Sequence, residues 1–242
     1  MKNAAPNSSA TAAATVHLRG ISSMATRQLL AQLTAAYMHR SGCSLDIESV
    51  GGVDAARRVQ AGEPFDVVFL ASDAIDKLVA SGHIKAGSKR DLAHSGVAVA
   101  VRAGTPQPDI SSEEAVRQAV LVAPSISYST GPSGVALMKL FERWGIADVV
   151  QSRIMVPPPG IPVGALIARG EVALGFQQLS ELIHVEGIAV VGPLPPAIQI
   201  ITTFSAGCSS NSAQASAVQD LLDFMSGPDA AEAKRQQGME PA

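Results

Sequence analysis

VHLRGISSMATRQLL, Val16 to Leu30, combines the patterns of a strand, a loop and a helix. It begins as a short apolar strand, passes through a loop containing Ser22 and Ser23, and continues into a helical pattern. Where a helix begins, its first backbone N–H groups have no partner inside the helix, and the positive end of the helix dipole points outward. Such a loop favours an anion-binding site, although small residues there also serve simply as helix caps.

Similar units recur along the chain. FDVVFLA (65–71) is an apolar strand, and SISYSTGPSGVALMKLFERWGI (125–146) is a second strand–loop–helix unit. PPPGIPVGALIARGEVALGFQQLSELI (157–183) is a third loop that feeds a helix, followed by a strand that ends at Gln177 and Gln178. Apolar strands separated by amphipathic helices indicate an α/β fold with parallel sheets covered on both faces. Several small-residue loops at strand ends therefore predict one ligand-binding crevice.

The composition limits the partners. Of 242 residues, 47% are hydrophobic and 16% charged, which indicates a well-buried protein of one large or two modest lobes. A net charge of −3 without a basic cluster argues against nucleic acid and anionic membrane surfaces as partners.

No apolar run approaches the roughly 18 to 20 residues of a membrane helix, so no membrane insertion is expected. Residues 1–14 lack an apolar centre and predict a disordered N-terminal arm rather than an intact signal peptide.

The sequence predicts no metal site and no cofactor. Cys43 and Cys208 lack the spacing of metal or redox motifs, and whether they pair is left open. The histidines form no ligand cluster, and no serine–histidine–acid order emerges, so hydrolase and metalloenzyme chemistry have little support.

A family resemblance covers nearly the whole chain. It is carried, in order, by AGEPFDVVFLASDAIDKL (61–78), DLAHSGVAVAVRAG (91–104), YSTGPSGVALMKLFERWGI (128–146), VGALIARGEVALGFQQLSEL (163–182) and VVGPLPPAIQIITTFSAG (190–207). In these blocks the chain resembles the periplasmic solute-binding proteins related to the molybdate-binding receptors of ABC importers. The resemblance implies the type II periplasmic-binding-protein fold, in which two α/β lobes joined by two crossover strands hold a ligand between them. Lobe 1 would comprise residues 15–93 plus 202–242 and lobe 2 residues 94–201, and the protein would be periplasmic.

The resemblance also implies a set of site residues. Molybdate-binding receptors hold the oxyanion with two loop hydroxyls, backbone N–H groups from two loops and a tyrosine hydroxyl. By position these contacts fall on Ser22, Gly52, Ser133, Val163 and Gln178. Gly52 has no side-chain donor and Gln178 replaces the tyrosine, so a ligand longer than a tetrahedral oxyanion is expected. The full set of expected substrate-binding residues is Arg19, Ser22, Ser23, Gly51, Gly52, Ser72, Ser129, Thr130, Ser133, Pro162, Val163, Gln177 and Gln178.

Arg19 precedes the first loop, where the molybdate receptors usually carry a small residue. A guanidinium at this place could bind a carboxylate through two hydrogen bonds. The alternative is that Arg19 points out of its strand into solvent, and the sequence leaves both open.

Within this family the chain resembles enzymes that interconvert trans- and cis-aconitate, which favours a small carboxylate, aconitate, as ligand. The resemblance implies a cofactor-free 1,3-allylic proton shift, which needs N–H or cationic donors for the developing negative charge and one side chain that carries the proton. Candidates for that side chain are Asp54, Glu48 and Tyr128. The alternative is a non-catalytic periplasmic receptor that delivers a carboxylate or oxyanion to the permease of an ABC importer.

Overall fold

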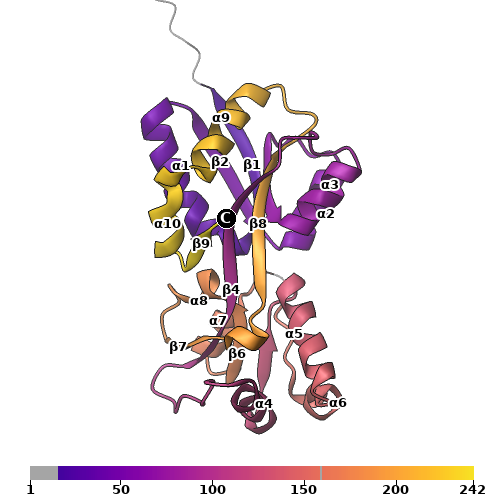
Figure 1. Cartoon of the computed structure of the whole chain (residues 1–242), viewed down its shortest axis with the longest axis vertical. Helices are drawn as coiled ribbons and strands as arrows, with labels where there is room; N and C mark the ends of the chain where they lie inside the picture. Colours follow the sequence, from indigo (N-terminus) through magenta and orange to yellow (C-terminus); the bar gives the residue numbers. More distant parts are fainter. Residues whose placement is uncertain (1–15, 159) are drawn as a thin grey trace, which may run out of the picture.

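Two α/β lobes, one above the other in Figure 1, are joined by two long strands, β4 (Arg90–Arg102) and β8 (Ile201–Cys208). The structure is a computed structural model that describes residues 16–158 and 160–242, so the expected arm at residues 1–14 lies outside the described residues. β4 and β8 pair antiparallel from Arg90 opposite Ala206 to Gly96 opposite Ile201. The two-lobed α/β fold class is thereby confirmed, whereas the predicted residue limits of the lobes stay a prediction.

The upper lobe is built on a sheet with the strand order β2-β1-β3-β8-β4. β1 is parallel to both β2 and β3, and β8 and β4 continue the sheet antiparallel. The strands that this lobe adds to the two crossovers are β1 (His17–Ser23), β2 (Ser44–Val50), β3 (Val67–Ala71) and β9 (Met239–Pro241), which pairs with β4. One face carries α1 (Arg27–Ser41), α9 (Ala215–Ser226) and α10 (Ala231–Gln236), and the other carries α2 (Gly52–Gln60) and α3 (Ser72–Ala80).

Burial explains the sequence of β3. All of its residues are buried, because helices cover both faces of the sheet. Val67 and Phe69 belong to the core beneath α1 and α9, and Val68 and Leu70 to the core beneath α2 and α3. A strand placed between two cores has no solvent face, which is why its sequence shows no alternation of apolar and polar residues.

The lower lobe is built around the second half of β4. β6 (Leu174–Gln178) and β7 (Ile188–Pro193) both pair with β4, and β5 (Ile126–Tyr128) is parallel to β6. The helices of this lobe are α4 (Glu113–Val122), α5 (Pro132–Arg143), α6 (Ala147–Val150), α7 (Val163–Ala168) and α8 (Leu179–Leu182). Short 3-10 turns complete the chain at η1 (Met24–Thr26), η2 (Gln151–Arg153), η3 (Pro196–Ile198) and η4 (Pro228–Ala230).

The two cysteines do not form a disulfide. Cys43 and Cys208 are both buried free thiols in the core of the upper lobe. Within residues 16–158 and 160–242, no helix is both long enough and apolar enough to cross a membrane.

Candidate functional site between the lobes

Several helices that follow strands begin without a side-chain cap. The residues at the N-cap positions of η1, α2, α3, α5, α7 and α8 are Ser23, Gly51, Ala71, Gly131, Pro162 and Gln178, and none accepts a hydrogen bond from its own helix through its side chain. Because a helix cannot satisfy its own first N–H groups, these starts offer backbone donors to a ligand. Most of the site residues predicted from the sequence lie at these starts.

A cavity of about 380 Å³ lies between the lobes beside β8. Ser72, the first residue of α3 in the upper lobe, and Ser133, in the first turn of α5 in the lower lobe, both line it. The predicted residues Ser72 and Ser133 are therefore brought together. Asp73 and Asp76 line the same cavity and were not predicted, and Asp76 accepts a hydrogen bond from Lys89 at 2.7 Å.

A second group of predicted residues lies at the ends of β1 and β6. The hydroxyl groups of Ser22 and Ser49 hydrogen-bond at 2.8 Å, which fixes the end of β1 against β2. Ser23 is buried, and its hydroxyl oxygen has no hydrogen-bond partner among the described residues. Gly52 lies beside it, since a Cβ built on Gly52 would be 3.6 Å from the Cβ of Ser23. Buried polar atoms are almost always satisfied, so this hydroxyl needs a partner, which a ligand or a water molecule can supply.

Gln178 connects the end of β6 to the cavity beside β8. Its Nε2 donates to the hydroxyl of Thr202 at 2.8 Å, and Thr202 lines that cavity. Its Oε1 is buried and has no hydrogen-bond partner within residues 16–158 and 160–242. Gln178 therefore presents a side-chain amide with one unpaired atom where the resemblance implied a tyrosine hydroxyl.

The start of α7 is tied to β6 and α8 through Gln177. The backbone N–H of Gly164, next to the predicted Val163, donates to Oε1 of Gln177 at 3.3 Å. Nε2 of Gln177 in turn donates to Oε1 of Glu181 at 2.8 Å. Burial raises the pKa of Glu181 to about 7, and the hydrogen bond from Gln177 partly opposes this rise.

Glu181 was not among the residues predicted from the sequence. The signal that could have found it is local: Glu181 is the only charged residue between Val172 and His184, and it follows closely on Gln178 at the start of a helix. An isolated carboxylate beside predicted ligand-binding residues, in an otherwise uncharged stretch, is typical of a site with a shifted pKa.

The loop before α5 is tightly folded. The Ser129 hydroxyl accepts a hydrogen bond from the N–H of Gly131 at 3.1 Å. A Cβ built on Gly134 would lie 1.6 Å from the carbonyl oxygen of Ser129, so only glycine fits there. This close approach fixes the loop that carries Ser129 and Thr130 against the first turn of α5.

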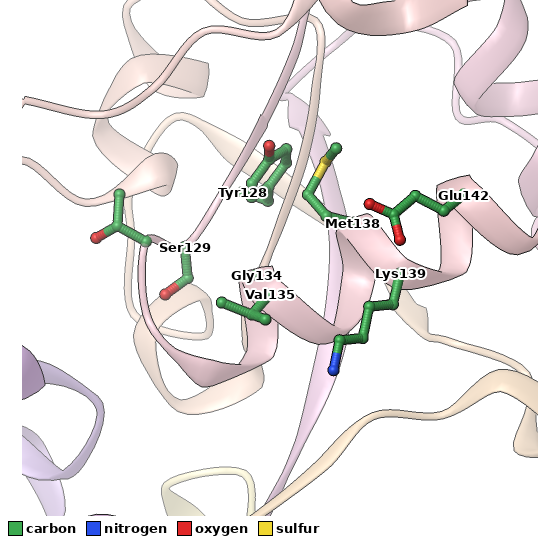
Figure 2. Close-up of a pocket in the computed structure, with 8 residues that line it drawn as sticks. Tyr128, Ser129, Gly134, Val135, Met138, Lys139 and Glu142 are labelled. Atoms are coloured by element: carbon green, nitrogen blue, oxygen red, sulfur yellow. The ribbon is translucent and has the colours of Figure 1, made fainter. Parts of the chain in front are cut away.

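Tyr128, Ser129 and Thr130 line a different cavity, of about 280 Å³, against the outer side of α5. Figure 2 shows the hydroxyl of Tyr128 and the ammonium of Lys139 pointing away from one another. Burial raises the pKa of Tyr128, which makes its phenol harder to ionise. The structure thus separates these three predicted residues from the cavity that Ser72 and Ser133 share.

Arg19 is not brought together with the predicted ligand-binding residues. Its guanidinium lies over the ring of Phe65, 5.9 Å from the ring centroid, and the residue is exposed. Side chains alternate along a strand, so Arg19 and Ser22 project from opposite faces of β1. The geometry favours the alternative in which Arg19 points towards solvent.

Glu48 and Asp54, two of the expected proton carriers, lie in ion pairs on the outer surface. Arg58 donates to both carboxylate oxygens of Glu48, at 2.5 and 2.9 Å, and lowers the pKa of Glu48. Asp54 accepts from Arg57 at 2.9 Å on the exposed side of α2. A carboxylate whose pKa is lowered by an arginine is a weaker base, so Glu48 is poorly suited to take a proton from carbon.

No group of three or more His, Cys, Asp or Glu side chains that could hold a metal ion occurs in the part of the chain that the structure describes. The candidate site consists instead of hydroxyls, amides, helix starts and the carboxylates of Asp73 and Asp76, with Glu181 hydrogen-bonded to Gln177 nearby in α8.

Two α/β lobes with helix starts and buried polar groups gathered between them define a solute-binding protein of the two-lobed type. The model of the bacterial extracellular solute-binding protein family matches residues 18–240, and the chain belongs to that family. An aconitate isomerase from Pseudomonas sp is 41% identical over 216 residues, which are 87% of this chain and 82% of that protein.

Solved structures share the fold at low sequence identity. The periplasmic molybdate-binding protein of Azotobacter vinelandii superposes with a TM-score of 0.75 and 22% identity, covering 92% of this chain and 98% of that chain. The sulfate-binding protein SubI from Mycobacterium tuberculosis H37Rv gives a TM-score of 0.77 and 16% identity, covering 94% of this chain and 87% of that chain. At these identities the likeness concerns the fold.

Proposed function

We propose that this chain is an isomerase that interconverts trans- and cis-aconitate between its lobes, without a cofactor. The observation that carries the proposal is the 41% identity to an aconitate isomerase over 87% of the chain. The helix starts without side-chain caps and the buried hydroxyls could bind the substrate carboxylates. Glu181 adds a carboxylate in α8, the helix that contacts the upper lobe through Ser180.

The reaction is a 1,3-allylic proton shift. Removal of a methylene proton leaves an anion whose charge spreads over the allylic carbons and the flanking carboxylates. Backbone N–H groups that are already oriented, such as those at the starts of α5 and α7, stabilise that charge without reorganising. Return of the proton to the other allylic carbon completes the shift of the double bond.

The groups at this site differ from those that a receptor for a small tetrahedral anion uses. Gly52 supplies no hydroxyl, and the Gln178 amide stands where a tyrosine hydroxyl was implied. A substrate with several carboxylates separated by carbon atoms would place its charges at different helix starts and its carbon atoms near Gln178.

A second candidate function is a non-catalytic receptor for a carboxylate, and the solved binding proteins that share the fold favour it. Both functions would place the protein in the periplasm, in keeping with the extracellular family to which it belongs. A permease partner would be needed only by a receptor.

Turnover separates these functions. The protein is mixed with a thousandfold molar excess of either trans-aconitate or cis-aconitate, without added metal or nucleotide, and the two isomers are measured by chromatography. We expect both reactions to reach the same final mixture of isomers. Saturable binding with each isomer recovered unchanged would contradict the isomerase and leave the receptor.

A further inference from the structure

We propose that Glu181 carries the proton in the isomerisation, an inference that rests on the proposed function. Glu181 lies in the first turn of α8, the helix that begins directly after Gln178. Figure 1 shows α8 at the end of the lower lobe that is nearest to the upper lobe. The Ser180 hydroxyl crosses between the lobes and donates to the carbonyl oxygen of Ala25 in η1 at 2.9 Å. The helix that carries Glu181 therefore contacts the upper lobe beside Ser23.

The carboxylate of Glu181 is held by one oxygen. Gln177 donates to Oε1, and Gln177 is itself fixed by the N–H of Gly164 and by its buried position in β6. No described residue forms a hydrogen bond with Oε2, and the side chain is half-buried rather than enclosed. One oxygen thus orients the group, and the other remains available to a substrate.

The surroundings bring no opposite charge to this carboxylate. η1 and β6, which pack against α8, contain no ionisable residue. α7, which packs against Leu182 of α8, contains none either. The ionisable residues of β4, which also packs against α8, are engaged elsewhere or distant: His94 with Thr203, Arg90 with Asp223, Asp91 with Ser205, and Arg102 beside Gly170. Burial therefore dominates, and with a pKa of about 7 both the base and the acid form are present near neutral pH.

Glu181 alone can both take the proton from the substrate and return it. Oε2 of Glu181 takes a proton from the substrate methylene carbon, and the electron pair of the broken C–H bond becomes the new C=C bond. The electron pair of the former C=C bond then binds the proton from the Glu181 carboxyl at the opposite allylic carbon. The carboxylate is restored, so no oxidant, reductant or second acid is consumed.

The other acidic groups near the lobe interface are less suited. Asp76 is paired with Lys89, and Asp73 is exposed, 3.7 Å from Lys77. Glu181 is the half-buried carboxylate whose only described hydrogen-bond partner is a neutral amide.

The test compares Glu181→Gln and Glu181→Asp with Glu186→Gln, an exposed glutamate just beyond α8. We expect Glu181→Gln to lower kcat by about 100-fold or more, while the Kd for trans-aconitate measured by calorimetry stays within about threefold. Glu181→Asp should retain measurable turnover with a displaced kcat–pH midpoint, and Glu186→Gln should match the wild type.

Two results would overturn this role. If the wild type turns over and Glu181→Gln keeps kcat within about threefold with an unchanged pH profile, another group carries the proton. If the wild type binds aconitate but never converts it, the isomerase function itself fails, and the role of Glu181 fails with it.

Discussion

Gln177 and Glu181 are joined by a hydrogen bond of 2.8 Å, from Nε2 to Oε1, which connects the end of β6 to the start of α8. Because Gln177 also accepts from Gly164, the same amide orients the start of α7. The Glu181 carboxylate and the first turn of α7 are therefore held in a fixed relation by one side chain. Fixed geometry of this kind is what a proton transfer beside a developing anion requires.

Glu181 should make stability depend on pH. Burial raises its folded pKa to about 7 from the ordinary value of 4.5, so the folded chain binds this proton more tightly than the unfolded chain. The stability that proton binding at Glu181 contributes to the folded chain is fully present below about pH 4.5 and is lost as the pH rises through 7.

From pH 5 to pH 8, the wild type should lose about 1–3 kcal/mol more unfolding free energy than Glu181→Gln, because the variant has no proton to release at that position. Urea denaturation at the two pH values measures this difference, with Glu186→Gln as the control. If the unfolding free energy of wild type and of Glu181→Gln changed equally between pH 5 and pH 8, the pKa of Glu181 would not be raised by burial.

Gly52→Ser should fold normally and impair the site. The new Cβ would meet Ser23 at 3.6 Å, an ordinary contact, so Tm should stay within about 2 °C. The added hydroxymethyl group would narrow the space beside Ser23, and KM for aconitate should rise about fivefold or more. Val53→Ser, at the next position and with Val53 71% exposed, should leave both quantities unchanged. An unaltered KM in Gly52→Ser would place the substrate elsewhere.

Gly134→Ala should destabilise the lower lobe. The Cβ would overlap the Ser129 carbonyl oxygen, which cannot move without displacing the loop before α5. We expect the free energy of unfolding to fall by about 2–4 kcal/mol. Gly131→Ala in the same loop is the matched control, since its Cβ would be 3.4 Å from the nearest atom and its φ is −84°, so it should cost less than about 1 kcal/mol. Equal stability of the two variants would contradict the tight loop.

Arg19→Ala should leave the aconitate Kd within about twofold of wild type, because the guanidinium lies over Phe65, on the face of β1 opposite Ser22, and is screened by solvent. Calorimetry provides the measurement. A tenfold weaker Kd would mean that Arg19 reaches the substrate after all.

Much of the fold could be predicted because its signals are local. The strand at FDVVFLA and the loops before α5 and α7 are set by apolar runs, glycines and prolines within a few residues. β9 and α10 were not predicted, since a three-residue strand is defined by its pairing with β4 rather than by its own sequence.

The site was predicted less completely, for physical reasons. Hydroxyl and glycine loops mark helix starts in the sequence, so Ser72 and Ser133 could be found although they come from different lobes. The face on which Arg19 projects and the partner of Glu48 depend on strand register and on α2 packing, which no local pattern encodes. The raised pKa of Glu181 depends on burial between elements that are distant in sequence.

A crystal structure with bound propane-1,2,3-tricarboxylate, the saturated analogue of aconitate, would show where the substrate lies relative to the helix starts and Glu181. We predict that its carboxylates bind at the starts of α5 and α7 between the lobes, with a carboxylate oxygen of Glu181 within about 3–3.5 Å of a substrate carbon. An analogue bound outside the interlobe space, or a Glu181 carboxylate directed away from every carbon of the bound molecule, would contradict the account.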